Sequence, residues 1–495
     1  MDDNNEKPLE NQIDPNSTPV FETVPVESPQ EEQPKIEETP EEVVNPEAPG
    51  EPPGNDLPPP VYQESKNQFM LIAGGGVVFF IIFILIIKAI FFGGSSANKP
   101  VTLTYWGLWE DQQVMQPLID QYQQANPNVK INYVKMSTDS YRDKLIARSK
   151  EGQGPDIFRF HNTWVPELGE ILSPLPQQIM TNAEFEKTFY KVQQTDLKVG
   201  NYYYGLPLEI DGLVLIYNDS LLKQAGITTP PATWDDITTI VPKLTVKDTQ
   251  GNLITSGMAM GTTSNIEHFS DIFGLLLVQN GGSLSRLDQT EAAGALEIYR
   301  KFAEAPQGYW SDDMPNSINA FIQGKVAMII APSWEALSIK TANPEISMKV
   351  APVPAVPGAA SISLASYWVE GVSRFSKNQI EAWKFLRYLT EKDNMTKLYE
   401  IESKLRPFGE PYSRVDLAPL LAQNDYLGAV IKEAGNFVSL PLISRTYDNG
   451  LDDEITKYIE NAINSTEQGV SYSEALKTAS DGVKQVFTKY NINSQ

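Results

Sequence analysis

The most constraining feature of the 495-residue sequence is an apolar run, Phe69–Phe92, that carries a single charge at Lys88. As an α-helix its 24 residues would be about 36 Å long, enough to cross a hydrocarbon core of about 30 Å with some tilt. A helix of a soluble domain rarely needs apolar side chains on every face. A cleaved signal peptide would be shorter and basic at its start, although the small residues Ser95 and Ala97 leave cleavage open as an alternative. We therefore predict a transmembrane helix over residues 68–92.

The segment before this run, residues 1–67, has a composition unlike the rest of the chain. It contains 17 acidic residues, 3 Lys and 14 of the 36 Pro, and it accounts for −14 of the net charge of −24. Charge repulsion and the lack of apolar surface leave little to offset the entropy lost on ordering. We predict a disordered acidic, Pro-rich tail over 1–67, with a docking or spacer role as the functional alternative. A Gly/Ser-containing linker follows the helix over residues 93–100.

The composition of the whole chain excludes several kinds of chemistry. The chain has no Cys, which removes disulfides, thiol nucleophiles and zinc–thiolate sites. Two His, at positions 161 and 268, are too few for a His-rich metal site, and we expect neither metal nor cofactor. The excess of acidic residues disfavours nucleic acid, whose binding depends on Lys and Arg contacts to phosphate. Motifs of serine hydrolases, zinc proteases, P-loop NTPases and EF-hands do not occur in the sequence.

From residue 101 onward, strand and helix patterns alternate. Apolar and polar residues alternate over 101–105 and 129–133, which predicts two strands, and the segment between them has apolar residues at helical spacing. A helix over 141–150 and an apolar strand over 156–160 follow. This order is typical of parallel βαβ units. It predicts an α/β lobe whose ligand binds at the carboxyl ends of the strands.

Farther along the chain, the boundaries of two more helices are marked by capping residues. A strand over 213–217 leads directly into Asn218, which we expect to cap a helix that ends near Gly226. Thr233 and Asp236 have the spacing of a capping box, which predicts a second helix start.

Several short landmarks occur in one order along the chain. They are Tyr105-Trp106-Gly107, Gly154-Pro155-Asp156-Ile157, the stretch from Gly205-Leu206-Pro207 to Tyr217-Asn218, Ala225-Gly226-Ile227 to Thr233-Trp234, the stretch Ala320 to Met328, Ser333-Trp334, and Ala351-Pro352-Val353-Pro354. Each landmark alone is unspecific. In this order, over nearly all of residues 101–490, they resemble the family 1 extracellular solute-binding proteins, the group that contains maltose-binding protein.

The resemblance implies an α/β fold of two lobes, a type II periplasmic-binding-protein clamp that closes around its ligand. Lobe one would take about 101–209 and 352–403, and lobe two about 210–351 and 404–495. The resemblance also implies capture of a solute outside the cell for delivery to an ABC permease, with the binding domain extracellular and the tail cytoplasmic. The Lys residues on either side of the apolar run lean slightly toward the opposite orientation.

The chemistry of a sugar ligand suggests which residues would bind it. A neutral sugar presents hydroxyls and apolar C–H faces, so its site needs aromatic platforms and planar polar groups. Residues from 100 onward carry −12, which disfavours anionic ligands. The aromatic candidates are Trp106, Trp109, Trp164, Trp334, Tyr367, Trp368 and Tyr447, with core packing as the alternative for each. The polar candidates are His161, Asn162, Glu209, Asp211, Glu267, His268, Arg406 and Arg445, followed by Glu110 and Asp111.

Among these candidates, Trp334 and Asp211 match ligand-binding positions of the family, although Pro332 replaces the Gly that the family has two residues before its Trp. Glu209 and Asp211 are two residues apart on an extended segment and therefore share a face. They leave open a surface glycoside hydrolase, which needs two carboxyl groups about 5 to 10 Å apart. A membrane-anchored sensor, whose closure is detected by a partner other than a permease, is the other alternative. We expect a binding protein rather than an enzyme.

Overall fold

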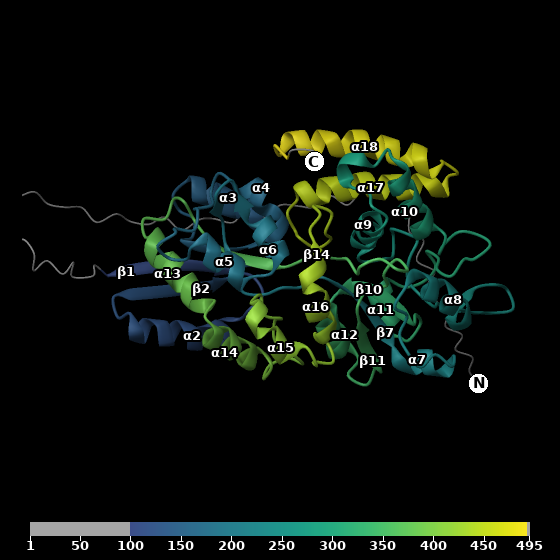
Figure 1. The fold of residues 1–495 in the computed structure, drawn as a ribbon, viewed down its shortest axis with the longest axis horizontal. Helices are drawn as coiled ribbons and strands as arrows, with labels where there is room; N and C mark the ends of the chain where they lie inside the picture. Colours follow the sequence, from purple (N-terminus) through teal and green to yellow (C-terminus); the bar gives the residue numbers. More distant parts are fainter. Residues whose placement is uncertain (1–99, 493–495) are drawn as a thin grey trace, which may run out of the picture. The chain divides into compact units, whose positions relative to one another are not determined.

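The computed structural model describes residues 100–492, which form two lobes (Figure 1). The predicted tail, the predicted membrane helix and the linker up to residue 99 lie outside the described residues. Within 100–492, no helix is both long enough and apolar enough to cross a bilayer.

The first lobe is built on a five-stranded sheet with the strand order β2-β1-β3-β13-β6. β1 is parallel to both β2 and β3, which confirms the predicted βαβ units. β13 comes from much later in the chain and is antiparallel to β3 and β6. The elements are β1 (Val101–Gly107), α2 (Gln112–Ala125), β2 (Val129–Lys135), α3 (Tyr141–Lys150), β3 (Ile157–His161), η1 (Asn162–Trp164), α4 (Val165–Leu168), α5 (Asn182–Thr188), α6 (Lys191–Asp196), β4 (Lys198–Val199), β5 (Tyr202–Tyr203), β6 (Leu206–Pro207), β13 (Trp368–Val372), α13 (Gln379–Leu389) and α14 (Lys392–Glu402).

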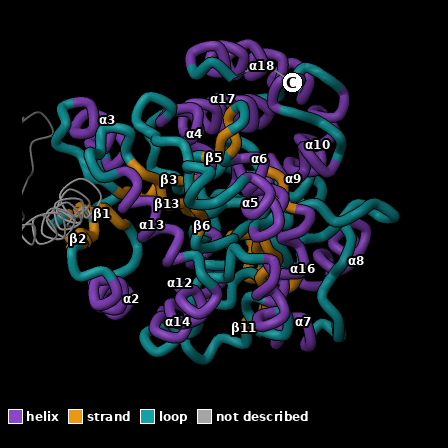
Figure 2. The backbone as a smooth tube through the Cα atoms, turned by 60° about the vertical axis from the view of Figure 1, so that its left-hand side comes forward, coloured by secondary structure: helices purple, strands orange, loops and turns teal. Residues whose placement is uncertain are grey.

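Hydrophobic periodicity explains how this lobe packs. Alternate residues of β1, including Leu103 and Tyr105, are buried, and α2 buries the apolar stripe that its sequence predicts. β3 is buried at all five positions because it lies in the middle of the sheet. The view in Figure 2 shows helices surrounding these strands.

The second lobe contains a three-stranded antiparallel sheet with the order β10-β7-β11. Asn218 caps α7 by accepting from Ser220 N and Leu221 N, and Thr233 and Asp236 form the predicted capping box of α8. The remaining elements are β7 (Leu213–Asn218), α7 (Asp219–Gln224), α8 (Trp234–Leu244), β8 (Val246–Lys247), β9 (Leu253–Thr255), α9 (Phe269–Gln279), η2 (Leu284–Arg286), α10 (Thr290–Arg300), α11 (Ser317–Ile322), β10 (Met328–Pro332), α12 (Glu335–Ala342), β11 (Met348–Ala351), β12 (Ser363–Leu364), η3 (Val415–Leu417), α15 (Ala418–Leu421), α16 (Gly428–Glu433), η4 (Ala434–Asn436), β14 (Phe437–Val438), α17 (Leu451–Glu467) and α18 (Tyr472–Lys489).

The last two helices, α17 and α18, pack against each other and lie over α9 and α10 (Figure 1, yellow). Their amphipathic sequences bury Ile455, Ile459, Leu476 and Val483. The C-terminal part of the chain therefore completes the core of the second lobe.

Segments that lead from one lobe to the other lie side by side. Glu209 is bridged to Tyr412, and Ile210 N donates to Pro411 O at 2.9 Å. A Cβ atom at Gly212 would lie 2.3 Å from Leu364 O, so only glycine fits at this crossing. Each lobe thus draws on separated stretches of sequence, and the residue boundaries of the predicted lobes stay a prediction.

Candidate functional site

A cavity of about 310 Å³ opens between the two lobes, next to the crossing segments. It lies at the carboxyl ends of β1 and β3, where the βαβ pattern predicts a ligand. The residues that line it are Trp109, His161, Glu209, Asp211, Trp334, Leu337, Ser338, Ser366, Trp368, Arg406, Glu410, Ser444, Arg445 and Tyr447.

One wall of the cavity is aromatic. The rings of Trp109 and Trp368 meet edge to face with centroids 5.3 Å apart, and Tyr447 lies 6.2 Å from Trp109. The His161 ring also meets Trp368 edge to face, with centroids 5.2 Å apart. Trp109 is 37% exposed and lines the cavity, so part of its apolar face is available for contact. Such faces can pack against the C–H faces of a sugar ring.

The opposite wall carries Trp334, which lies between β10 and α12 in the second lobe. Asp211, from the first crossing segment, holds its backbone in place. Asp211 Oδ2 accepts from Trp334 N at 3.2 Å, and Oδ1 accepts from Ser333 N and Gly212 N. Burial raises the pKa of Asp211 to about 7. The carboxyl group therefore orients Trp334 as well as facing the cavity.

Charged groups lie close together on the side of the cavity that is formed by the segments leading from one lobe to the other. Glu209 Oε1 accepts from Trp368 N at 2.9 Å, and burial together with neighbouring Glu410 raises its pKa. Arg406 pairs with Glu410 at 2.8 Å and lies 3.1 Å from Glu402. Both carboxylates that face the cavity here are thus engaged with protein groups.

The loop before α17 brings Ser444, Arg445 and Tyr447 to the cavity. Arg445 and Tyr447 have positive φ angles of 59° and 57°, conformations that cost a non-glycine residue of order 1–3 kcal/mol each. An ion pair from Arg445 to Glu267 and the contact of Tyr447 with Trp109 hold the loop in this shape. Strained backbone that presents two side chains to one cavity is typical of a binding loop.

Nine of the fifteen main candidates from the sequence line this cavity. They are Trp109, His161, Glu209, Asp211, Trp334, Trp368, Arg406, Arg445 and Tyr447. The structure brings them together from both lobes, and their roles in binding remain predictions.

Three candidates are buried and are not among the residues that line the cavity. Trp164 has no exposed surface and packs edge to face against Trp368, so it supports a lining residue. Asn162 donates to Asp196 and Ser439 and accepts from Tyr367 N. Tyr367 is also fully buried, and its hydroxyl donates to Asp196 at 2.8 Å. The sequence cannot show this, because a chain position at a strand end does not reveal which way its side chain turns.

The other three candidates lie outside the lining for different reasons. Trp106 is half-buried and packs on Tyr141. Glu267 accepts from Asn316 and pairs with Arg445, so it supports that lining residue. His268 is buried, with its ring nitrogens 2.7 Å from Ser444 Oγ and 3.3 Å from Glu335 Oε1. The second-rank residues Glu110 and Asp111 are also outside the lining.

Sequence reasoning missed five residues of the lining, Leu337, Ser338, Ser366, Glu410 and Ser444. Leu337 and Ser338 follow Trp334 on α12 and could have been found from helical geometry. Glu410 lies only four residues after the candidate Arg406, so its position close to the cavity could have been inferred from the sequence. Ser366 and Ser444 carry no distinguishing pattern.

His161 gives the protein a specific dependence on pH. Burial lowers the pKa of His161 to about 3, whereas the unfolded chain has an ordinary value of about 6.5. Below pH 6.5 the unfolded state binds a proton at His161 that the folded state does not bind. The free energy of unfolding therefore decreases as the pH falls. Between pH 7 and pH 5, His161 should lower the free energy of unfolding by about 2 kcal/mol. The measurement is the free energy of unfolding in urea at both pH values.

His161→Gln is the control, because it removes the titrating group. Asp211 and Glu433, whose pKa values burial raises to about 7, act in the opposite direction in both proteins. The prediction therefore concerns the difference between the two proteins. An equal change in both would show that His161 is not held neutral.

Comparison with known proteins agrees with this architecture. The sequence model for bacterial extracellular solute-binding protein matches residues 117–410. A putative binding protein of Brucella abortus (strain 2308) is 26% identical over 302 residues, covering 60% of this chain and 72% of the relative. The maltodextrin-binding protein MdxE of Bacillus subtilis (strain 168) is 24% identical over 320 residues, covering 61% of this chain and 72% of the relative.

Solved structures show the same fold. A cyclo/maltodextrin-binding protein complexed with maltotetraose superposes with a TM-score of 0.64 at 21% identity, covering 79% of this chain and 98% of the other. The sugar-binding protein MalE from Xanthomonas citri superposes with a TM-score of 0.65 at 18% identity, covering 79% of this chain and 98% of the other. Because the family match spans more than half of the chain and the two-lobed fold agrees with it, the chain belongs to the bacterial extracellular solute-binding protein family.

Proposed function

We propose that the protein captures a carbohydrate, an oligosaccharide or polyol, outside the cell and delivers it to an ABC permease. The observation that carries this proposal is the cavity between the lobes, with Trp109, Trp368 and Tyr447 on one wall and Trp334 on the other. The names of relatives support it, since they include maltotriose-, maltodextrin- and diacetylchitobiose-binding proteins. A neutral sugar suits a cavity whose charged groups are mostly paired within the protein.

Binding in this cavity would favour closure of the lobes. Trp368 belongs to the first lobe and Trp334 to the second, so a ligand that contacts both rings binds the closed form more tightly than the open one. Moving the population from 1:99 to 99:1 takes a difference in affinity of about 10⁴-fold. Contacts with two or three aromatic rings can supply a large part of that difference.

The proposal includes a membrane anchor. The apolar run over 68–92 would hold the binding domain on the outer face, with the acidic tail of 1–67 in the cytoplasm. Tethering raises the effective concentration of the domain near its permease.

The two alternatives have weaker support. A glycosidase would use Glu209 and Asp211, but Asp211 accepts three backbone N–H groups and Glu209 accepts from Trp368 N. Carboxyls held in this way orient backbone rather than attack a glycosidic bond. A sensor role has no specific observation in its favour.

The test is a thermal-shift series on the full-length chain with maltooligosaccharides, chito-oligosaccharides, polyols, amino acids and anions. A ligand at 100 times its dissociation constant should stabilise the folded state by about 2.7 kcal/mol and raise Tm by a few degrees. We expect at least one carbohydrate to do so. A response only to amino acids or anions would contradict the proposal, and release of shortened sugars during incubation would favour the glycosidase.

A further inference from the structure

A row of four polar side chains connects the ligand cavity with the first turn of α17. Ser366 lines the cavity, and its Oγ lies 3.2 Å from Nε2 of His161. Nδ1 of the same ring lies 2.8 Å from Thr163 Oγ1, which donates to Asp452 Oδ2 at 2.6 Å. Thr163 and Asp452 are 289 residues apart in the sequence and belong to different lobes. The row therefore forms only where the two lobes meet.

The His161 ring can take two arrangements within this row. Burial keeps the ring neutral at physiological pH, because it lowers the pKa of His161 to about 3. A neutral imidazole has one N–H and one bare nitrogen, so Nδ1 and Nε2 cannot both donate. The nitrogen that carries the proton therefore decides the direction of the hydrogen bonds on both sides of the ring.

The contacts of Asp452 favour one of the two arrangements. Burial and neighbouring Asp448 raise the pKa of Asp452, whereas its hydrogen bonds lower it. These bonds come from Thr163 Oγ1 and from Ile443 N, which lies 2.9 Å from Oδ1. An oxygen–oxygen distance of 2.6 Å is typical of a hydroxyl bound to an ionised carboxylate. Asp452 is also the second residue of α17, where the helix N-terminus stabilises negative charge.

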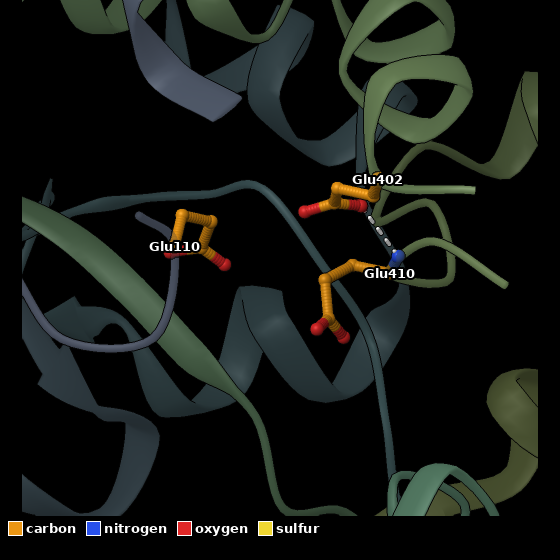
Figure 3. A group of neighbouring side chains, drawn as sticks. All are labelled: Glu110, Glu402 and Glu410. Atoms are coloured by element: carbon orange, nitrogen blue, oxygen red, sulfur yellow. Dashed lines mark hydrogen bonds between the residues drawn. The ribbon is translucent and has the colours of Figure 1, made fainter. Parts of the chain in front are cut away.

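Three other carboxylates near the cavity are held differently. Glu110, Glu402 and Glu410, which Figure 3 shows, are paired with Arg159 or Arg406. Asp452 is held by a hydroxyl and a backbone N–H. Its charge therefore acts on neighbouring hydrogen-bond donors.

An ionised Asp452 directs every hydrogen bond of the row toward itself. Thr163 has a single hydroxyl proton, and donating it to Asp452 leaves Oγ1 to accept from Nδ1–H of His161. Nε2 is then bare and accepts from the Ser366 hydroxyl. Thr163 N lies 3.4 Å from Nδ1 and favours the opposite order, but this contact is longer than an ordinary hydrogen bond. Ser366 Oγ is left with lone pairs and no free proton for a ligand.

We propose that Thr163 and Asp452 are positioning residues that make Ser366 a hydrogen-bond acceptor in the cavity, so that the site selects a solute with a donor at that point. The acceptor does not depend on which solute binds, whereas its use by a sugar hydroxyl rests on the function proposed above. A hydroxyl supplies the donor, and a fluorine at the same position cannot. Selection follows because a polar group left unpaired in a binding site is costly.

The first experiment locates the His161 proton and needs no ligand. The chain contains two His, so labelling the full-length chain with ¹³C,¹⁵N-histidine gives two ring systems, and His161→Gln assigns them. Magic-angle-spinning NMR at pH 8 should show the proton of His161 on Nδ1. A proton on Nε2 would overturn the proposal.

Two variants should move this proton to Nε2. In Asp452→Asn, Ile443 N holds the amide oxygen, so the amide N–H faces Thr163 Oγ1 and the Thr163 hydroxyl must donate to Nδ1. Thr163→Val removes the acceptor for Nδ1–H and leaves the backbone N–H of residue 163 beside Nδ1.

Two matched controls should leave the proton on Nδ1. Thr163→Ser keeps the hydroxyl, and Asp453→Asn makes the same charge change at an exposed neighbour. A proton that stays on Nδ1 in either folded variant, Asp452→Asn or Thr163→Val, would refute the positioning role. If neither variant folds, the spectrum of the unsubstituted chain decides.

The second experiment tests selection with the carbohydrate that gives the largest thermal shift. At least one of its mono-deoxyfluoro derivatives should bind about tenfold more weakly than the parent sugar, because it lacks the donor to Ser366. That loss should shrink in Asp452→Asn, where Ser366 donates instead. Equal losses in both proteins for every derivative would contradict the selection. If no carbohydrate binds, the proposed function fails, and the position of the His161 proton still decides the role of Thr163 and Asp452.

Discussion

Replacing Trp334 with Ala should lower the affinity for the carbohydrate ligand by about 30-fold or more, equivalent to about 2 kcal/mol. Trp334 is a large aromatic side chain that the second lobe presents to the cavity, which Trp109 and Trp368 line from the first lobe. The change removes a ring face but keeps the backbone N–H that Asp211 accepts. The measurement is the dissociation constant by calorimetry, with the ligand that gives the largest thermal shift.

Trp106→Ala is the matched control for this change. Trp106 is half-buried and lies outside the cavity, so its removal should alter stability without altering affinity. If both variants lost affinity equally, the effect would be general loosening rather than loss of a stacking surface. If neither lost affinity, Trp334 would not contact the ligand.

Arg159→Leu should lower the free energy of unfolding by about 3–5 kcal/mol. Arg159 is 2% exposed and pairs with both Glu110 and Glu370. Its removal leaves two buried carboxylates without their cation, and breaking a buried ion pair costs more than the pair itself contributes. The measurement is urea denaturation at pH 7, with the slope of the transition compared between the proteins.

Arg148→Leu makes the same substitution at an exposed position. Its ion pair with Glu151 is 3.8 Å long and open to solvent. The substitution should therefore alter the free energy of unfolding by no more than about 0.5 kcal/mol. In the Arg159→Leu background, an added Glu370→Gln should recover part of the loss, because one of the unpaired charges is removed. Equal effects of the two Arg substitutions would mean that burial of Arg159 has no energetic consequence.

Much of the fold of residues 100–492 is predictable because it depends on local patterns. The alternation of Leu103 and Tyr105 with polar residues defines β1, and the stripe along α2 defines its buried face. Asn218 and Thr233 mark helix starts through hydrogen bonds within a few residues. β13 is different. Its place between β3 and β6 depends on partners more than 150 residues earlier in the chain, which no local period records.

The candidate site was predicted unevenly for the same reason. Trp334 and Asp211 were identified from landmarks, and both line the cavity. Trp164 has the same residue type and a similar place after a strand as Trp109, yet Trp164 is fully buried while Trp109 is exposed. The difference comes from the packing of Trp368 over Trp164, a contact across some 200 residues of sequence.

The sequence by itself determined the apolar run at 68–92, the acidic segment before it, the absence of Cys and the order of strands and helices, because each is a property of composition or local spacing. Only the tertiary structure decided which aromatic side chains line the cavity, and that Glu110, Glu402 and Glu410 meet beneath it. Those arrangements depend on distant segments that pack together, and the energy of a buried charge depends on every neighbour that surrounds it.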